Sequence, residues 1–165
     1  METAQHNLSF TDLAQAQAYA QAHCLPEKAV GYTVRGAELL VFDHMLGGVA
    51  GVQVVSGGLE VGETPEQAAL RDANGQTGRS GFGSSAALSS LVWLNSEHAQ
   101  REMRRFVYLT APAGLPDTWP HPANRCLFSF RCEPLHAPGL DSEGERAASR
   151  RKGRGSCTRG VSFLH

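Results

Sequence analysis

The strongest local signal in this sequence is the start of a helix at Thr64. Thr64 has the side chain of a good N-cap residue, Pro65 then takes the first helical position, and Gln67 stands three residues after the cap, where it can close a capping box. The sequence therefore predicts a helix that begins at Thr64. A short apolar strand at residues 52–55 precedes it and is expected to stop at the Ser-Gly-Gly run of residues 56–58.

The N-terminal part of the chain has two further patterns. Residues 11–23 are rich in alanine and glutamine and open on Thr11, a residue that can cap the first turn, so they predict a helix. Residues 29–35 and 38–43 are both rich in β-forming side chains and are joined at Gly36, which predicts a β-hairpin.

The C-terminal half is expected to hold three more strands. Their segments are rich in β-branched and aromatic residues and lie at 88–94, 104–110 and 126–132. Residues 111–125 carry several prolines together with Trp119, and they predict a long loop of the kind often used for binding.

The order of these elements is helix, hairpin, strand, helix and three strands, which describes a mixed β-sheet with helices packed on it, an α+β fold. The chain has 165 residues, of which 41% are hydrophobic and 19% are charged. That composition can bury a core and is not the composition of a disordered chain. The length allows one full domain with short extensions.

Charge and hydropathy restrict the partners and the compartment. The formal net charge is −1, so the whole chain offers no strong field to nucleic acid or to a membrane. No apolar run approaches the roughly 20 residues that span a bilayer, and the first residues lack a signal-peptide pattern. We therefore expect no membrane association and a cytoplasmic location. The cysteines show no C-x-x-C spacing and the histidines form no pair, so a zinc site is not indicated.

One stretch carries a chemical pattern. Residues 57–79 read GGLEVGETPEQAALRDANGQTGR. Gly57, Glu63, Arg71 and Gly78 stand at the spacing of the Nudix box, in which a glycine is followed by a glutamate, then by Arg-Glu, a Glu-Glu pair and a closing glycine. The chain therefore resembles the Nudix (MutT-like) hydrolase superfamily with a degenerate box. The resemblance implies a Nudix fold, a mixed β-sheet sandwiched between α-helices.

The resemblance divides the chain into three parts. Residues 1–24 form an N-terminal helical extension and residues 25–141 form the Nudix domain. Residues 142–165 are polar, glycine-rich and basic, with six basic side chains against two acidic ones, and are expected to be a disordered tail. Nucleic acid is not an expected partner unless it binds this basic tail.

The departures from the box fall at its acidic positions. In the family, the glutamates after the arginine bind Mg²⁺ or Mn²⁺, which bridges the diphosphate of a nucleoside diphosphate linked to another moiety. Here the first of them is Asp72, and the Glu-Glu pair is Gly75 and Gln76. These three positions share one face of a helix. That face offers one carboxylate where the family has three, so only weak binding of Mg²⁺ or Mn²⁺ is expected.

Gly75 also bears on the helix itself. A glycine inside a helix costs about 1 kcal/mol relative to alanine, and Asn74-Gly75 is a turn signal. Two outcomes are open. The helix can continue through Gly75 and keep Gln76 on the metal-facing side, or it can end early, in which case Gly78 loses its role as the C-terminal cap.

The resemblance also implies roles for individual side chains. Glu63, Arg71 and Asp72 are the expected catalytic residues, with Arg71 positioning the acidic groups through charge-assisted hydrogen bonds. Asp72, Glu63 and Gln76 are the expected metal ligands. Glu60 or Glu66 could help to hold a metal that is already chelated by substrate phosphates. A later loop could add a carboxylate as ligand or base, and the candidates, none marked by a motif, are Glu97, Glu102 and Asp117.

Three residues are expected to bind the substrate. Gly57 and Gly58 let backbone approach a phosphate closely, although a glycine pair can also simply end a strand. Trp119 is placed in a loop, where it can stack on a base, whereas aromatic residues on strands more often belong to the core.

Two functions follow from these residues. The first is a metal-dependent hydrolase of a nucleoside diphosphate linked to another moiety, with activity weakened or lost because the Glu-Glu pair is replaced by Gly75 and Gln76. The alternative is a non-catalytic Nudix-fold protein that binds a nucleotide or has a regulatory role. Nucleotide binding that needs no metal would favour the alternative. The sequence indicates no oligomeric state.

Overall fold

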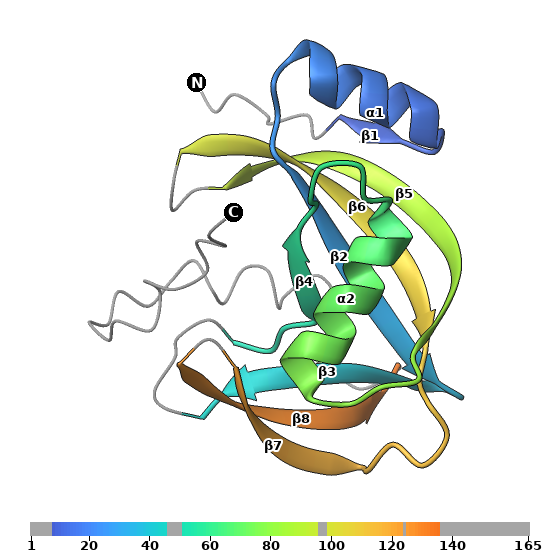
Figure 1. Ribbon diagram of the computed structural model, residues 1–165, viewed down its shortest axis with the longest axis vertical. Helices are drawn as coiled ribbons and strands as arrows, with labels where there is room; N and C mark the ends of the chain where they lie inside the picture. The colour runs from blue at the N-terminus through green and yellow to red at the C-terminus, as the bar shows by residue number, and fades with distance from the viewer. Residues whose placement is uncertain (1–7, 46–50, 96–98, 124, 136–165) are drawn as a thin grey trace.

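The computed structural model describes residues 8–45, 51–95, 99–123 and 125–135. Within these ranges the chain forms a mixed β-sheet and two helices (Figure 1). In chain order the elements are β1 (Ser9–Phe10), α1 (Leu13–Ala22), β2 (Glu27–Arg35), β3 (Glu38–His44), β4 (Val55–Gly58), α2 (Pro65–Thr77), β5 (Gly83–Asn95), β6 (Gln100–Thr110), β7 (Thr118–Ala123) and β8 (Cys126–Pro134). Neither of these helices is long and apolar enough to cross a membrane.

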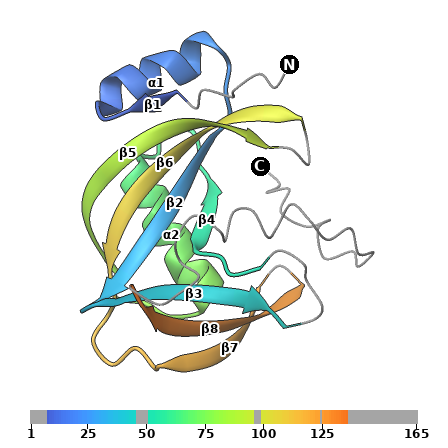
Figure 2. The ribbon, with the colours of Figure 1, turned by 180° about the vertical axis from the view of Figure 1, so that it is seen from behind.

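The sheet follows the order β1-β5-β6-β2-β3-β8-β7, and β4 pairs with β2 outside this path. β2 and β6 run parallel, whereas the other paired strands run antiparallel, which makes the sheet mixed. β2 and β3 pair only beside their turn, at Val34–Leu39 and Arg35–Glu38. Beyond the turn they diverge, so the sheet opens into a β5-β6-β2 part and a β3-β8-β7 part (Figures 1 and 2).

Helix α2 lies against β2 and β4, with its C-terminal end toward β3 and β7 (Figure 1). Three alanines, Ala68, Ala69 and Ala73, form its buried face and pack into the main core around Leu109 and Phe130. Small side chains let the helix approach the strands closely, which is why this alanine-rich stretch can be buried despite its low hydrophobicity. The packing fixes which helix residues face β4.

A second, smaller core holds the N-terminal helix. Ala16 and Ala20 of α1 pack against Val92 and Met103, which belong to β5 and β6. The nearly buried Arg105 adds polar bonds, because it pairs with Glu27 and donates to the carbonyl oxygen of Leu13. The predicted helix is confirmed, although its N-cap is Asp12 and not Thr11.

The α+β fold and the β2–β3 hairpin are confirmed, with Gly36 at the turn in a positive-φ conformation. Two expectations need correction. The strand expected at 52–55 is β4, which begins at Val55 and runs through both glycines, because it pairs with β2 as far as Gly58. The loop expected at 111–125 contains a strand, β7. The expected disordered tail at 142–165 lies outside the described residues.

The β7 strand escapes sequence analysis because of its prolines. Pro120 and Pro122 have no N–H to donate, and proline is normally read as a break in a strand. Among the described strands, β7 lies at the edge of the sheet and pairs only with β8, so no described strand needs donors from its second side. An edge strand can therefore accept two prolines.

Helix α2 continues through Gly75, which settles the alternative left open by the sequence. The capping box of Thr64 and Gln67 is present with Pro65 at its start. At the other end Gly78 adopts the left-handed conformation, with φ of 66°, and its N–H donates to the Asn74 carbonyl oxygen. Gln76 therefore stays on the helix, and Gly78 keeps its role as the cap.

Substitution of the two glycines by alanine should have opposite effects on stability. A Cβ at Gly75 meets no atom within 4 Å, so Gly75→Ala should raise the free energy of unfolding by about 0.5–1 kcal/mol through helix propensity. A Cβ at Gly78 would lie 2.3 Å from Cε1 of His121 in a left-handed residue, so Gly78→Ala should lower it by about 1–3 kcal/mol. Urea unfolding of both variants checks this. Destabilisation by Gly75→Ala would contradict a continuous helix.

Candidate functional site

Arg71 is the centre of the hydrogen-bond network at the box. Its Nε and Nη2 donate to the two carboxylate oxygens of Glu63 at 2.9 and 3.0 Å, which is a bidentate pair. Nη2 also donates to the Gly58 carbonyl oxygen at 2.8 Å, and Nη1 donates to Oδ1 of Asp72 at 3.0 Å. One guanidinium thus joins the end of β4, the loop after it and α2. The predicted contact between Arg71 and the acidic residues is present.

The local fold brings Glu63 to Arg71. Glu63 immediately precedes the N-cap of α2, and Arg71 lies two turns along the helix, so the arginine reaches back to the helix start. A turn holds the carboxylate from the other side, since the Glu60 N–H donates to Oε2 of Glu63 at 2.9 Å. The hydrogen bonds from Arg71 lower the pKa of Glu63, even though partial burial opposes this. Glu63 is therefore ionised, with both oxygens already bonded.

Asp72 lies directly over Gly57. Its side chain is 4% exposed, and a Cβ on Gly57 would lie 2.3 Å from its Oδ2. Only glycine at position 57 leaves room for this carboxylate. Gly57 was expected to let the backbone approach a phosphate. In the structure the group that approaches Gly57 is the carboxylate of Asp72. Among the described residues Oδ2 has no hydrogen-bond partner, although it is buried.

Burial controls the charge of Asp72. It raises the pKa of Asp72 to about 6, because the charged form loses its hydration there. The positive charge of Arg71 acts in the opposite direction, and the negative charge of Glu63 reinforces the rise. The raised pKa of Asp72 agrees with its unpartnered Oδ2, because within the described residues no hydrogen bond stabilises the charged form at that oxygen.

The last two positions of the acidic pattern hold no carboxylate. Gly75 faces open space. The side-chain amide of Gln76 donates from Nε2 to the Ser56 carbonyl oxygen at 2.7 Å, which binds α2 to β4. Only the amide oxygen of Gln76 stays available as a neutral donor to a cation.

The three expected metal ligands all have contacts within the protein. Glu63 has both oxygens in the pair with Arg71, Asp72 is buried over Gly57, and Gln76 is bonded to β4. Across the described part of the chain, no group of three or more His, Cys, Asp or Glu side chains could hold a metal ion. In this arrangement the three side chains offer a cation fewer accessible oxygens than three glutamates would.

The additional carboxylates do not complete the set. Glu60 is 72% exposed and lies 3.8 Å from Arg71. Glu66 is in the first turn of α2, where a negative charge suits the helix dipole. Glu102 pairs with Arg104 on β6, and Asp117 pairs with Arg35. Glu97 lies outside the described residues.

Trp119 is not in a loop, so that expectation was wrong. It is a β7 residue and is 7% exposed. Its ring stacks on Phe130 with centroids 5.1 Å apart, and its indole N–H donates to the Thr77 carbonyl oxygen at 2.9 Å. The ring is part of the core and holds the C-terminal end of α2 against β7. In this arrangement it is not open to stack on a base.

Sequence reasoning missed the backbone acceptors of the network. The carbonyl oxygens of Ser56 and Gly58 receive Gln76 and Arg71. Gly58 was expected to approach a phosphate, and in the structure its carbonyl contacts Arg71. No residue type marks a backbone acceptor. Such contacts can be found only once the pairing of β4 with β2 places that strand beside α2.

The fold is similar to solved Nudix structures. A NUDIX hydrolase from Nitrosomonas europaea matches with a TM-score of 0.52 and 16% identity, over 76% of this chain and 88% of that chain. The M. smegmatis Nudix hydrolase RenU has a TM-score of 0.45 and 16% identity, over 76% of this chain and 84% of that one. A UDP-X diphosphatase has a TM-score of 0.45 and 12% identity, over 84% and 70%.

No protein-family model matches the sequence, and no curated protein shows significant similarity to it. The fold is therefore shown by structure alone. The chain has the Nudix fold, as the residues of the box predicted.

The buried Asp72 should make stability depend on pH. The folded chain holds the Asp72 proton up to the raised pKa of about 6, whereas the ordinary pKa is 3.8, so the folded state binds more protons between these values. The free energy of unfolding should fall as pH rises through this window. Asp72→Asn keeps an oxygen for Arg71 and removes the charge, so at pH 7 it should be more stable than the parent, by up to about 3 kcal/mol.

Urea unfolding of the parent and of Asp72→Asn at a series of pH values between 3.5 and about 8 checks this, since the window is set by the ordinary and raised pKa of Asp72. The difference between the two proteins should vanish at the acidic end. A variant that is less stable than the parent at neutral pH would show that the carboxylate is stabilised in the folded state.

Proposed function

We propose that this chain is a Nudix-fold protein that binds a nucleoside diphosphate derivative and hydrolyses it poorly or not at all. The observation that carries the proposal is the state of the acidic positions. One carboxylate, Asp72, is buried, and the other two positions hold a glycine and an amide that is bonded to β4. The scaffold of the box is therefore kept while the ligand set of a metal-dependent hydrolase is missing.

Hydrolysis of a diphosphate needs charge stabilisation that these residues do not supply. A bound divalent ion neutralises the charge that develops on the phosphate oxygens and lowers the pKa of an attacking water. The side chains of Glu63, Asp72 and Gln76 leave few oxygens for such an ion, because most of them are bonded within the protein. A slow or absent chemical step follows, and binding does not require that step.

The retained contacts have a role that is independent of catalysis. The pair of Arg71 with Glu63 and the bond from Arg71 to Gly58 join β4 to the start of α2. These contacts keep the loop between β4 and α2 in one conformation. The presence of these contacts supports the proposal that the chain uses the shape of the box for binding.

One observation favours residual hydrolysis as a second candidate. Oδ2 of Asp72 is unpartnered, and Mg²⁺ can be held by one or two protein carboxylates when waters and substrate phosphates complete its shell. Under this alternative a metal would arrive with the substrate, and Asp72 would have to become accessible. Turnover that depends on Asp72 would then be measurable in the native chain.

Restoration of the acidic pattern tests the proposal. A glutamate fits at position 75 because a Cβ there meets nothing within 4 Å, whereas Gln76→Glu removes the amide that donates to Ser56. We expect no Mg²⁺- or Mn²⁺-dependent product release by the native chain from nucleoside triphosphates, nucleotide sugars or dinucleoside polyphosphates. We expect release by Gly75→Glu/Gln76→Glu, with Gly75→Glu alone as the variant that keeps the bond to Ser56.

Equilibrium dialysis with the same nucleotides, in the presence of a chelator, measures binding separately from turnover. Saturable binding by the native chain is expected. A second dialysis with Mg²⁺ in place of the chelator measures any metal-dependent binding, with Asp72→Ala as its control. Turnover by the native chain that disappears in Asp72→Ala would replace the proposal by the second candidate. Failure of every nucleotide to bind, both with the chelator and with Mg²⁺, would contradict both.

A further inference from the structure

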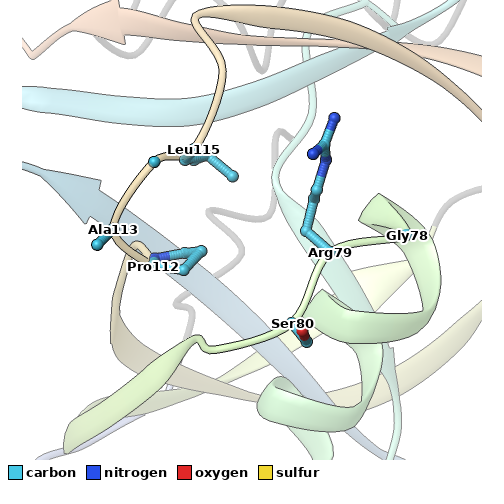
Figure 3. Close-up of a pocket in the computed structure, with 7 residues that line it drawn as sticks. Gly78, Arg79, Ser80, Pro112, Ala113 and Leu115 are labelled. Atoms are coloured by element: carbon cyan, nitrogen blue, oxygen red, sulfur yellow. The ribbon is translucent and has the colours of Figure 1, made fainter.

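A pocket of about 310 Å³ lies beyond the C-terminal end of α2 and does not include the residues of the acidic pattern (Figure 3). Residues 78–80 form one wall, and residues 112–115 of the β6–β7 connection form the other. Small-molecule sites usually range from about 300 to 1,000 Å³, so the volume is at the lower end of that range. It suits one charged group with a small attachment.

Three hydrogen bonds fix the backbone of the first wall, residues 78–80, and of Thr77 just before it. The Gly78 N–H donates to the Asn74 carbonyl oxygen, and the Arg79 N–H donates to the Thr77 hydroxyl at 3.1 Å. Trp119 fixes the same turn, since its indole N–H donates to the Thr77 carbonyl oxygen. The backbone that carries Arg79 is therefore set in place without a ligand.

The second wall is also fixed. Arg35 donates from Nη1 to the Leu115 carbonyl oxygen at 2.9 Å and from Nη2 to Asp117 at 2.7 Å. The Leu115 N–H closes a turn on the Pro112 carbonyl oxygen at 3.4 Å. Arg35 thereby anchors the β6–β7 connection and pairs with Asp117, the carboxylate nearest to this wall in the sequence, as well as with Glu38. A ligand would meet a preformed pocket and pay little ordering entropy.

Arg79 is the charged residue of this pocket. Its guanidinium carbon lies over the Trp119 ring, 5.4 Å from the centroid. In the described ranges, no carboxylate lies within 4.0 Å of its side chain and no hydrogen bond engages its guanidinium. The lining residues include no acidic side chain. Arg79 is an exposed residue whose cation lies against an aromatic ring, and within the described residues its guanidinium donors have no hydrogen-bond partner.

We propose that this pocket binds an oxyanion, the phosphate or carboxylate group of a small molecule, through the guanidinium of Arg79. The planar guanidinium presents paired N–H donors that match two oxygens of either group. The hydroxyl of Ser80 lies in the same wall and can add one donor. Binding here uses no metal and none of the box carboxylates, so this inference does not rest on the proposed function.

A simpler role for Arg79 is that its charge complements the negative end of α2. That role explains a cation after the helix, and it predicts an effect on stability alone. It does not explain two hydrogen-bonded walls around an open volume. The two roles therefore separate in a binding experiment.

The fluorescence of Trp119 provides the readout, because Arg79 lies over its ring. Trp93 is the second of the two tryptophans, so Trp93→Phe leaves Trp119 as the reporter. Titration of this protein with inorganic pyrophosphate and, separately, with citrate should give a saturable change in Trp119 emission with at least one of them. Whichever titrant binds more tightly identifies the phosphate or the carboxylate form of the ligand.

Arg79→Gln in the same background should weaken binding about tenfold or more, since a charge-assisted bidentate contact is lost. Arg101→Gln removes the same charge from an exposed position of β6 and should leave the affinity within about twofold, because distant surface charges are screened. Arg79→Lys keeps the charge without the paired donors and should be intermediate. Thermal unfolding confirms that each variant is folded.

The proposal is overturned if neither titrant gives a saturable change in the folded parent. It is also overturned if Arg79→Gln binds as tightly as the parent, or if Arg101→Gln loses as much affinity as Arg79→Gln. An equal loss of affinity in Arg101→Gln would show that the anion responds to the overall positive charge of the protein and not to this pocket. Loss of stability in Arg79→Gln without loss of affinity would assign Arg79 to the helix end alone.

Discussion

The arrangement of the box depends on the guanidinium of Arg71. It satisfies both oxygens of Glu63, one oxygen of Asp72 and the carbonyl oxygen of Gly58. These groups belong to the loop before α2, to α2 itself and to the end of β4. A partly buried arginine with a full set of acceptors is a strong local constraint, because each contact removed would leave a polar group unpaired. The position of β4 against the helix follows from it.

The same constraint limits what the carboxylates can do. An oxygen that accepts from arginine keeps only part of its capacity for a cation, and the remaining oxygen of Asp72 faces Gly57 in a buried position. In a helix with three acidic residues at these positions, oxygens would be left over for a metal. Here Gly75 supplies none, and Gln76 uses its amide to bind Ser56. Under the proposed function, the chain keeps the scaffold of the box with a reduced ligand set.

The parts of the molecule that sequence reasoning predicted are those with local causes. The start of α2 follows from the capping chemistry of Thr64, Pro65 and Gln67, and its end follows from a glycine at a left-handed position. The pairing of Glu63 with Arg71 is also local, since their separation is set by the helix and its cap. The resemblance to the Nudix box rested on these residues, and the fold confirmed it.

The features that the sequence did not predict depend on contacts between residues that are far apart in the sequence. The continuity of α2 at Gly75 depends on burial of Ala69 and Ala73 against the sheet, which outweighs the cost of one glycine. The β7 strand exists because β8 lies beside it and because nothing needs the missing donors of its prolines. Trp119 follows from that strand, which turns a residue expected in a loop into part of the core. Backbone acceptors such as Ser56 and Gly58 carry no signature at all.

Direct location of the metal tests whether the box persists as a scaffold without a metal centre. Crystals of the native chain grown with a nucleoside diphosphate and Mn²⁺ would allow anomalous diffraction to place any bound ion. We expect the pair of Arg71 with Glu63 to be intact and no anomalous peak within coordination distance of Asp72. A peak coordinated by Asp72 together with Glu63 or Gln76 would contradict this expectation and would show that the three residues form a metal site when substrate is bound.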